Sequence, residues 1–155
     1  METKGFSLIE FLIYMSILVI AVTGINLTAI NIFQTTAKSD TIAELAYNGQ
    51  FTMHKIKSNI NNSDSIVRPT TEGEELELTQ NGSSLLFKVA EGNLILEKDG
   101  IISDLTTSQI LIEKINFKKI SSDSIRITIK LSHENPEGLS EKAAGNVFIS
   151  SASLK

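Results

Sequence analysis

The sequence contains no cysteine and no tryptophan, and these absences remove several kinds of chemistry. Without cysteine, a disulfide, a thiolate metal ligand and a cysteine nucleophile are all excluded. Aromatic residues make up 6% of the chain, so a surface for stacking bases or sugars has little support. The motifs G-x-S-x-G and H-E-x-x-H are missing, and so is a phosphate-binding glycine loop. We therefore expect no enzyme and no cofactor.

Basic residues are too few and too scattered for a nucleic-acid-binding surface. The chain has 14 Lys and Arg against 18 Asp and Glu, which gives a formal net charge of −4. Domains that bind nucleic acids are usually basic. We therefore expect no contact with nucleic acid.

Candidate metal ligands do not form a recognisable site. Carboxylates gather at Glu72, Glu74 and Glu75, but no D-x-D-x-D-G calcium loop is present. We interpret this cluster as part of a solvated loop. His54 and His133 are far apart in the sequence, and we interpret both as surface residues. No metal site is expected.

Charged residues are absent from Phe11 to Ala37, a run of about 27 residues. A helix needs about 20 residues to cross a hydrocarbon core about 30 Å thick. The run therefore predicts a transmembrane helix. Glu10 lies at its start, where a carboxylate is costly unless it snorkels to the interface or has a partner.

The residues before this run have a fixed spacing. Lys4 precedes Gly5, and Phe6 and Glu10 follow. The stretch Gly5-Phe6-Ser7-Leu8-Ile9-Glu10 resembles the N-terminal motif of type IV pilins and of the pseudopilins of type II secretion systems. Together with the apolar helix, the resemblance covers about 30 residues.

The resemblance implies how the chain is processed and assembled. A prepilin peptidase would cut between Gly5 and Phe6, and Phe6 would become the N-methylated first residue. Glu10 would be the carboxylate needed for assembly, and Lys4 the leader charge. The implied partners are the cytoplasmic membrane, the prepilin peptidase, the pilus assembly platform and other pilin or pseudopilin subunits.

Elementary chemistry is compatible with the roles that the resemblance implies for Gly5 and Glu10. Gly5 has no Cβ to obstruct an extended backbone in a protease cleft. After cleavage, the new amine would be a cation beside an apolar helix and would need a carboxylate. Glu10 lies one helical turn beyond Phe6, so it can pair with its own amine or with that of a neighbour. The second arrangement would satisfy both charges only when a subunit docks.

The rest of the chain divides into three expected parts. These are a leader of residues 1–5, a transmembrane and assembly helix of residues 6–35, and a globular domain of residues 36–155. One helix is predicted from Phe6 to about Asn62, with Gly24 where many members of the family have proline. Its second half carries apolar residues at steps of three and four, which indicate a core-facing stripe: Ile42, Leu45, Gly49, Met53, Ile56 and Ile60.

Residues 64–155 are predicted to be rich in β-strands. Three turn signals separate short alternating segments: Asn81-Gly82, Glu91-Gly92 and Asp99-Gly100. Residues 125–131 alternate cleanly. Residues 110–112 and 115–119 are apolar enough for strand or partly helical structure, and residues 147–154 close the domain with a final strand. The predicted class is α+β and pilin-like, with a long N-terminal helix packed on a C-terminal antiparallel β-sheet.

We interpret the chain as a structural subunit of a type IV pilus or of a type II secretion-like pseudopilus. Its N-terminus would be cytoplasmic, and its globular domain would lie on the outer side of the membrane. The general layout favours a minor or tip subunit. Alternatives are a major pilin, a non-polymerising membrane-anchored binding module, a plain anchor and a cleaved secretory signal peptide.

Overall fold

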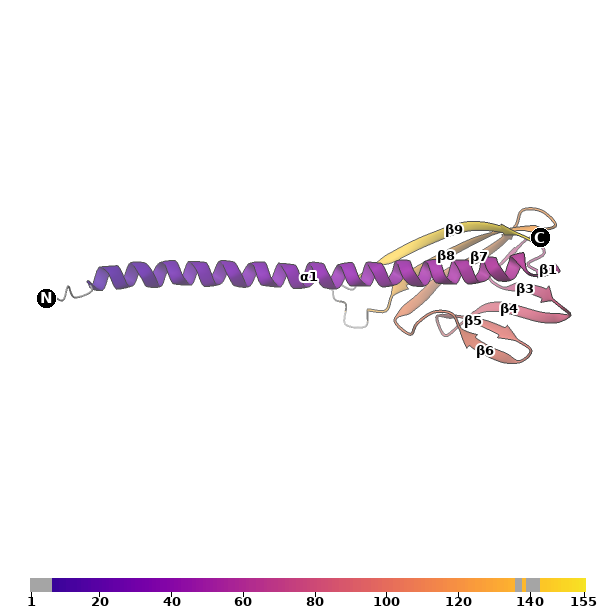
Figure 1. The fold of residues 1–155 in the computed structure, drawn as a ribbon, viewed down its shortest axis with the longest axis horizontal. Coiled ribbons are helices and arrows are strands. Elements are labelled where there is room, and N and C mark those ends of the chain that lie inside the picture. Colours follow the sequence, from indigo (N-terminus) through magenta and orange to yellow (C-terminus); the bar gives the residue numbers. More distant parts are fainter. Residues whose placement is uncertain (1–6, 136–137, 139–142) are drawn as a thin grey trace. The chain divides into compact units, whose positions relative to one another are not determined.

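The computed structural model describes residues 7–135, 138 and 143–155, and it confirms the predicted α+β class (Figure 1). A helix is followed by strands that form antiparallel sheets. The elements are α1 (Leu8–Asn61), β1 (Ser65–Arg68), β2 (Glu72–Gly73), β3 (Leu76–Gln80), β4 (Ser83–Ala90), β5 (Asn93–Lys98), β6 (Ile101–Asp104), β7 (Ile110–Lys119), β8 (Ser124–His133) and β9 (Gly145–Ser153).

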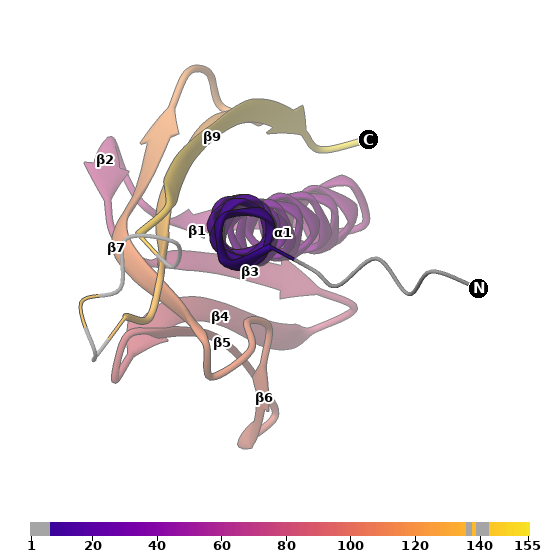
Figure 2. The same cartoon turned by 90° about the vertical axis from the view of Figure 1, so that its left-hand side faces the viewer.

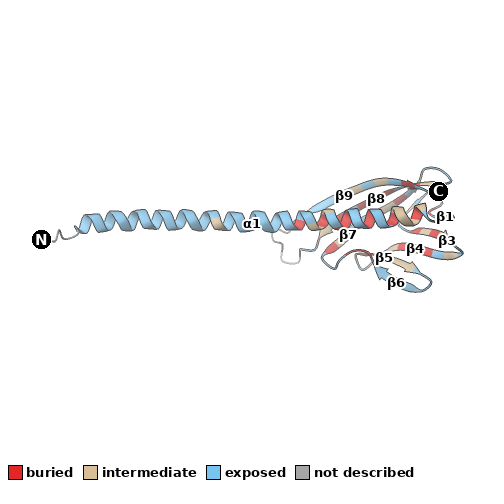
Figure 3. Ribbon diagram, viewed as in Figure 1, coloured by how far each residue is buried: buried red, intermediate tan, exposed pale blue. Residues whose placement is uncertain are grey.

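The chain divides into two compact units, residues 1–37 and residues 38–155. The part of α1 in the first unit is exposed along its whole length, apart from the half-buried Ala29 (Figure 3). It is α-helical through Gly24, around which no side chain of the described residues packs. An apolar helix with no protein covering suits a surrounding of lipid or of other apolar helices.

Four hydroxyl groups in this first part of α1 are satisfied within the helix. Ser16, Thr23, Thr28 and Thr35 each donate to the carbonyl four residues earlier, at 2.8 or 2.9 Å. A polar group with no partner would be costly in hydrocarbon. These local bonds explain how an apolar span tolerates these four hydroxyl side chains.

The strands of the second unit form two sheets, where the sequence predicted a single one. The five-stranded sheet has the order β1-β3-β4-β5-β6, and the four-stranded sheet has the order β2-β7-β8-β9. Strands β1 and β2 are short, and β2 contains Glu72, which was predicted to lie in a solvated loop. Residues 110–119 form the single strand β7, with a register shift between Ile112 and Lys114.

Strands β3 to β6 of the five-stranded sheet form a meander joined by three turns of the same kind. In each turn, both central residues have positive φ: 51° and 78° at Asn81-Gly82, 51° and 81° at Glu91-Gly92, and 52° and 81° at Asp99-Gly100. Two residues with positive φ define the turn whose twist matches paired strands. The three predicted turns are therefore confirmed.

The second part of α1 supplies one side of the core. Leu45, Met53, Ile56 and Ile60 are buried against residues of both sheets. The prediction was wrong at Ile42, whose side chain is 50% exposed, while the neighbouring Thr41 is buried. Figure 2 shows the sheets on different sides of this part of the helix, with β3 on one side and β9 crossing another.

The strand β8 provides the middle of the other side of the core. Ile125, Ile127, Ile129 and Leu131 are fully buried, as their clean alternation predicts. Strands β7 and β9 flank β8 and are antiparallel to it. The ring of Phe148 on β9 then lies against Gly49 on α1, where there is no side chain to keep it away.

Candidate functional site

The N-terminal end of α1 is built around Ser7 and Glu10. The N–H of Phe11 donates to the carbonyl of Ser7 at 3.2 Å, so Ser7 is the capping residue before the first helical position, Leu8. The side chain of Glu10 turns back and accepts a hydrogen bond from the N–H of Ser7 at 3.2 Å. Ser-x-x-Glu at this position is the capping-box pattern.

This arrangement places an anionic group where the helix can hold it. The first N–H groups of a helix have no partner within the helix, and its N-terminus carries a partial positive charge. Glu10 lies in the first turn and is exposed. It is the only charged side chain from Ser7 to Ala37, and it makes no ion pair with another described residue.

The other residues of the predicted processing site lie outside the described part of the chain. These are Lys4, Gly5 and Phe6. Glu10 is therefore the one predicted site residue whose surroundings the structure gives. Sequence reasoning missed the capping role of Ser7, although the spacing Ser7-x-x-Glu10 carried the signal.

The helix that follows Glu10 is long and apolar enough to cross a membrane. Seventeen large apolar side chains between Leu8 and Phe33 are exposed. In water, a surface of this kind is unfavourable by about 25 cal/mol for each Å². The helix fits a transmembrane anchor.

Two members of the acidic cluster of the second unit, Glu72 and Glu75, make surface contacts. Glu72 accepts a hydrogen bond from the Asn116 side chain at 2.7 Å and lies 3.6 Å from the Lys118 ammonium. Glu75 lies 3.4 Å from the Arg68 guanidinium. Within the described residues, no group of three or more His, Asp or Glu side chains could hold a metal ion.

The two histidines differ from each other. His54 is exposed on α1, as predicted. For His133 the prediction was wrong, because its side chain is only 9% exposed. Its Nε2 lies 3.6 Å from a carboxylate oxygen of Glu44, and its Nδ1 lies 2.8 Å from the carbonyl oxygen of Glu134. No local sequence signal links Glu44 to His133, so only the fold brings them together.

Comparison with known proteins returns one match. The family model for the prokaryotic N-terminal methylation motif matches residues 2–26. No curated protein and no solved structure matches the chain. The matched stretch includes Lys4, Gly5, Phe6 and Glu10 together with the first part of the apolar helix. The chain therefore carries the N-terminal signature of type IV pilins and pseudopilins.

Proposed function

We propose that the chain is a prepilin, a structural subunit that is stored in the membrane and then assembled into a type IV pilus or a pseudopilus. The observation that carries the proposal is the methylation motif at residues 2–26, which runs into a helix whose residues up to Ala37 are exposed, apart from the half-buried Ala29. A plain anchor would also need an apolar helix. It would have no use for a carboxylate at a fixed distance after Gly5 and Phe6.

Processing is the first step. Residues 1–5 would be removed by a prepilin peptidase that cuts between Gly5 and Phe6, and the new amine of Phe6 would be methylated. Residues 6–35 would then form the assembly helix, and residues 36–155 the globular domain outside the membrane. The partners in this step are the cytoplasmic membrane and the peptidase.

Assembly is the second step. The apolar helix would leave lipid and pack against the helices of other subunits, and this exchange of one apolar surrounding for another costs little. Glu10 would pair with the amine of a neighbouring subunit. The hydrogen bond from Ser7 at 3.2 Å supports this role, because it shows that the carboxylate can turn toward the N-terminal side of the helix.

We favour a minor or tip subunit over a major one because of the general layout of the chain. The major pilin remains the alternative within the same family. Abundance in purified filaments separates the two. A minor subunit is expected at a small fraction of the main subunit, and a chain that forms the bulk of the filament would be a major pilin.

The mass of the mature chain tests the proposal. In cells that contain a prepilin peptidase, we expect the loss of residues Met1 to Gly5 and the gain of one methyl group. In cells without the peptidase, the full chain should persist. Gly5→Val should also block cleavage, because a Cβ and its methyl groups obstruct the extended backbone at that position. An intact N-terminus in the presence of the peptidase would contradict the proposal.

A further inference from the structure

One edge of β9 carries no neighbouring strand among the described residues. The N–H of His133 donates to the carbonyl of Ala144, and the N–H of Leu154 donates to the carbonyl of Asp123. Together with the register of β8 and β9, these bonds show that the even-numbered residues of β9 direct their backbone N–H and C=O groups toward β8. The odd-numbered residues therefore direct their backbone N–H and C=O groups to the free edge, including Ile149, Ser151 and Ser153.

This edge lacks the features that protect other edge strands. Proteins blunt exposed edges by keeping them short, charged or bulged. The other edge strands in the described part of the chain are β1, β2 and β6. Strand β2 has only 2 residues, and β6 has 4 residues and ends at Asp104. Strand β1 has 4 residues, includes Arg68 and has a register shift. By contrast, β9 has 9 residues and contains neither a charge nor a proline.

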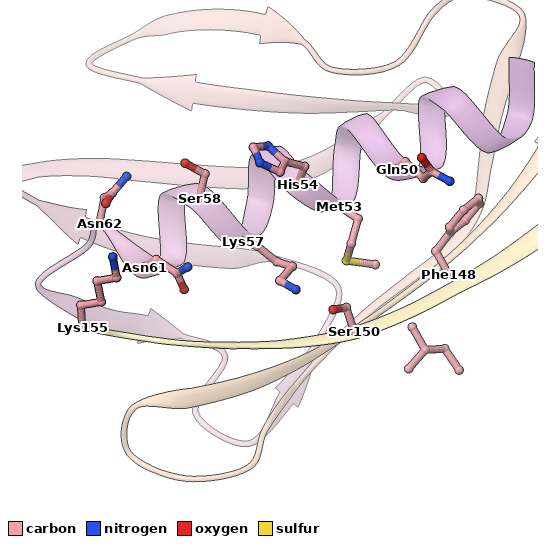
Figure 4. Close-up of a pocket in the computed structure, with 11 residues that line it drawn as sticks. Gln50, Met53, His54, Lys57, Ser58, Asn61, Asn62, Phe148, Ser150 and Lys155 are labelled. Carbon is pink, nitrogen blue, oxygen red and sulfur yellow. The ribbon is translucent and has the colours of Figure 1, made fainter.

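A groove of about 620 Å³ lies between β9 and α1. Figure 4 shows side chains of the helix and of β9 on its two sides. The ring of Phe148 on Gly49 lies at one end of the groove. Beyond this contact β9 leaves part of the helix uncovered, so that Gln50 and His54 are exposed. An added strand next to β9 would continue the sheet over this part of the helix.

The side chains that line the groove carry positive charge, although the chain as a whole is acidic. Lys57 and Lys155 line it together with His54, and no described Asp or Glu side chain does. Lys57 and Lys155 make no ion pair with another described residue. Two unpaired ammonium groups beside unpaired backbone groups favour a ligand that has both carboxylates and an extended backbone.

We propose that an extended, acidic segment of a partner protein binds along β9 as an additional strand. Its backbone would hydrogen-bond to Ile149, Ser151 and Ser153, and its carboxylates would contact Lys57 and Lys155. A second copy of this chain is a poorer occupant, because its own β9 carries no carboxylate. The surface lies within residues 38–155, so this inference goes beyond the proposed function and does not depend on cleavage at Gly5.

The probe is a short fluorescent peptide in which glutamate alternates with valine or threonine. Its binding to the purified full chain in detergent micelles is followed by fluorescence anisotropy. We expect saturable binding that weakens as salt is raised. A matched peptide with lysine in place of glutamate should not bind. A peptide of the same sequence with N-methylated amides along its bonding edge should not bind either, because it cannot pair as a strand.

Variants of the protein locate the site. Ser151→Pro removes an N–H that the β8–β9 ladder does not use, so it should spare the fold and weaken binding by about tenfold or more. Ile102→Pro is the matched control, because the N–H of Ile102 likewise points away from its sheet, at the edge of β6. It should leave binding unchanged. Lys57→Glu combined with Lys155→Glu should abolish binding of the acidic peptide and permit binding of the lysine peptide.

Each result bears on the inference. Equal binding of the N-methylated peptide, unchanged binding by Ser151→Pro, or no binding of the acidic peptide to the native chain would overturn it. Self-association of the native chain that Ser151→Pro removes would show that a second copy occupies the edge, and would overturn it as well. If Ser151→Pro does not fold, the charge-reversal variant and the N-methylated peptide decide the question. Normal cleavage at Gly5 is expected in every variant.

Discussion

The ring of Phe148 on β9 occupies the space that a side chain at Gly49 on α1 would fill. Glycine in the middle of a helix usually lowers stability by about 1 kcal/mol relative to alanine. Gly49 is nevertheless buried within the helix stripe that faces the sheets. Close approach of the strand therefore accounts for a residue that helix propensity alone disfavours.

We predict that Gly49→Ala destabilises the folded unit by about 1 kcal/mol. Overpacking of a core contact costs about 1–3 kcal/mol, and the better helix propensity of alanine offsets about 1 kcal/mol of that. Urea unfolding of the full chain in detergent micelles measures the change. In a Phe148→Ala background, the same substitution should become stabilising, because the ring is gone. A Gly49→Ala effect of the same sign in both backgrounds would contradict the contact.

A second prediction concerns the link between Glu44 on α1 and His133 on β8. The carboxylate lies 3.6 Å from His133 Nε2, and its other oxygen lies 3.5 Å from the Thr107 hydroxyl. Glu44→Ala would leave a nearly buried imidazole without this partner. We expect a loss of about 1–2 kcal/mol in the free energy of unfolding.

Asp40→Ala is the matched control for that substitution. Asp40 lies one turn earlier on α1, is exposed and makes no ion pair with a described residue. It should change stability by less than about 0.5 kcal/mol. If both variants unfold at the same urea concentration, the contact between Glu44 and His133 contributes nothing.

These two contacts show where prediction from the sequence ends. Local patterns were sufficient for the turns at Asn81-Gly82 and Asp99-Gly100 and for the buried alternation of Ile125 and Ile127. In each case the signal lies within a few neighbouring residues. The pairs Glu44–His133 and Gly49–Phe148 join residues about ninety to a hundred positions apart, so only the tertiary fold creates them.

The division into two sheets was missed for a similar reason. Strand β2 consists of Glu72 and Gly73 alone, and it is a strand only because it pairs with Lys118 and Phe117 of β7. Two polar or flexible residues carry no periodic signal of their own. At the candidate site, by contrast, the spacing from Gly5 to Glu10 was visible in the sequence, because the motif is a linear signal.

A third prediction concerns acid. The hydrogen bond from Asn116 and the charge of Lys118 lower the pKa of Glu72, and hydrogen bonds from Lys130 and Ser132 lower the pKa of Glu113. Because these pKa values are lower in the folded chain, the stability they contribute is present above the ordinary carboxyl pKa. It is lost as pH falls through the folded values.

The combined variant Glu72→Gln and Glu113→Gln should therefore flatten the decline of unfolding free energy between about pH 5 and pH 3. Both groups are exposed, so the change in slope should be modest. Glu74→Gln is the control, since Glu74 is exposed and makes no ion pair with a described residue. Urea unfolding at a series of pH values measures the slopes. An equal slope in the combined variant and in the native chain would contradict the prediction.

The last prediction separates two roles of Glu10. Its carboxylate accepts a hydrogen bond from the Ser7 N–H within one chain, and we propose that it pairs with the amine of a neighbour during assembly. Glutamine can serve in the capping box as well as glutamate can, but it has no charge. Valine can neither accept the hydrogen bond from the Ser7 N–H nor carry a charge. The pair Glu10→Gln and Glu10→Val therefore distinguishes a cap at the start of the helix from a charged contact between subunits.

We expect both variants to be cleaved and to remain in the membrane. Both should enter filaments about tenfold less than the native chain or worse, because an unpaired amine in an apolar surrounding costs several kcal/mol. Quantitative immunoblotting of sheared filaments against the membrane fraction measures this ratio. If Glu10→Gln assembles normally while Glu10→Val does not, the residue acts as a helix cap. If both assemble normally, Glu10 has no part in assembly. If the native chain itself is absent from the filaments, the anchored binding module becomes the better description of the chain.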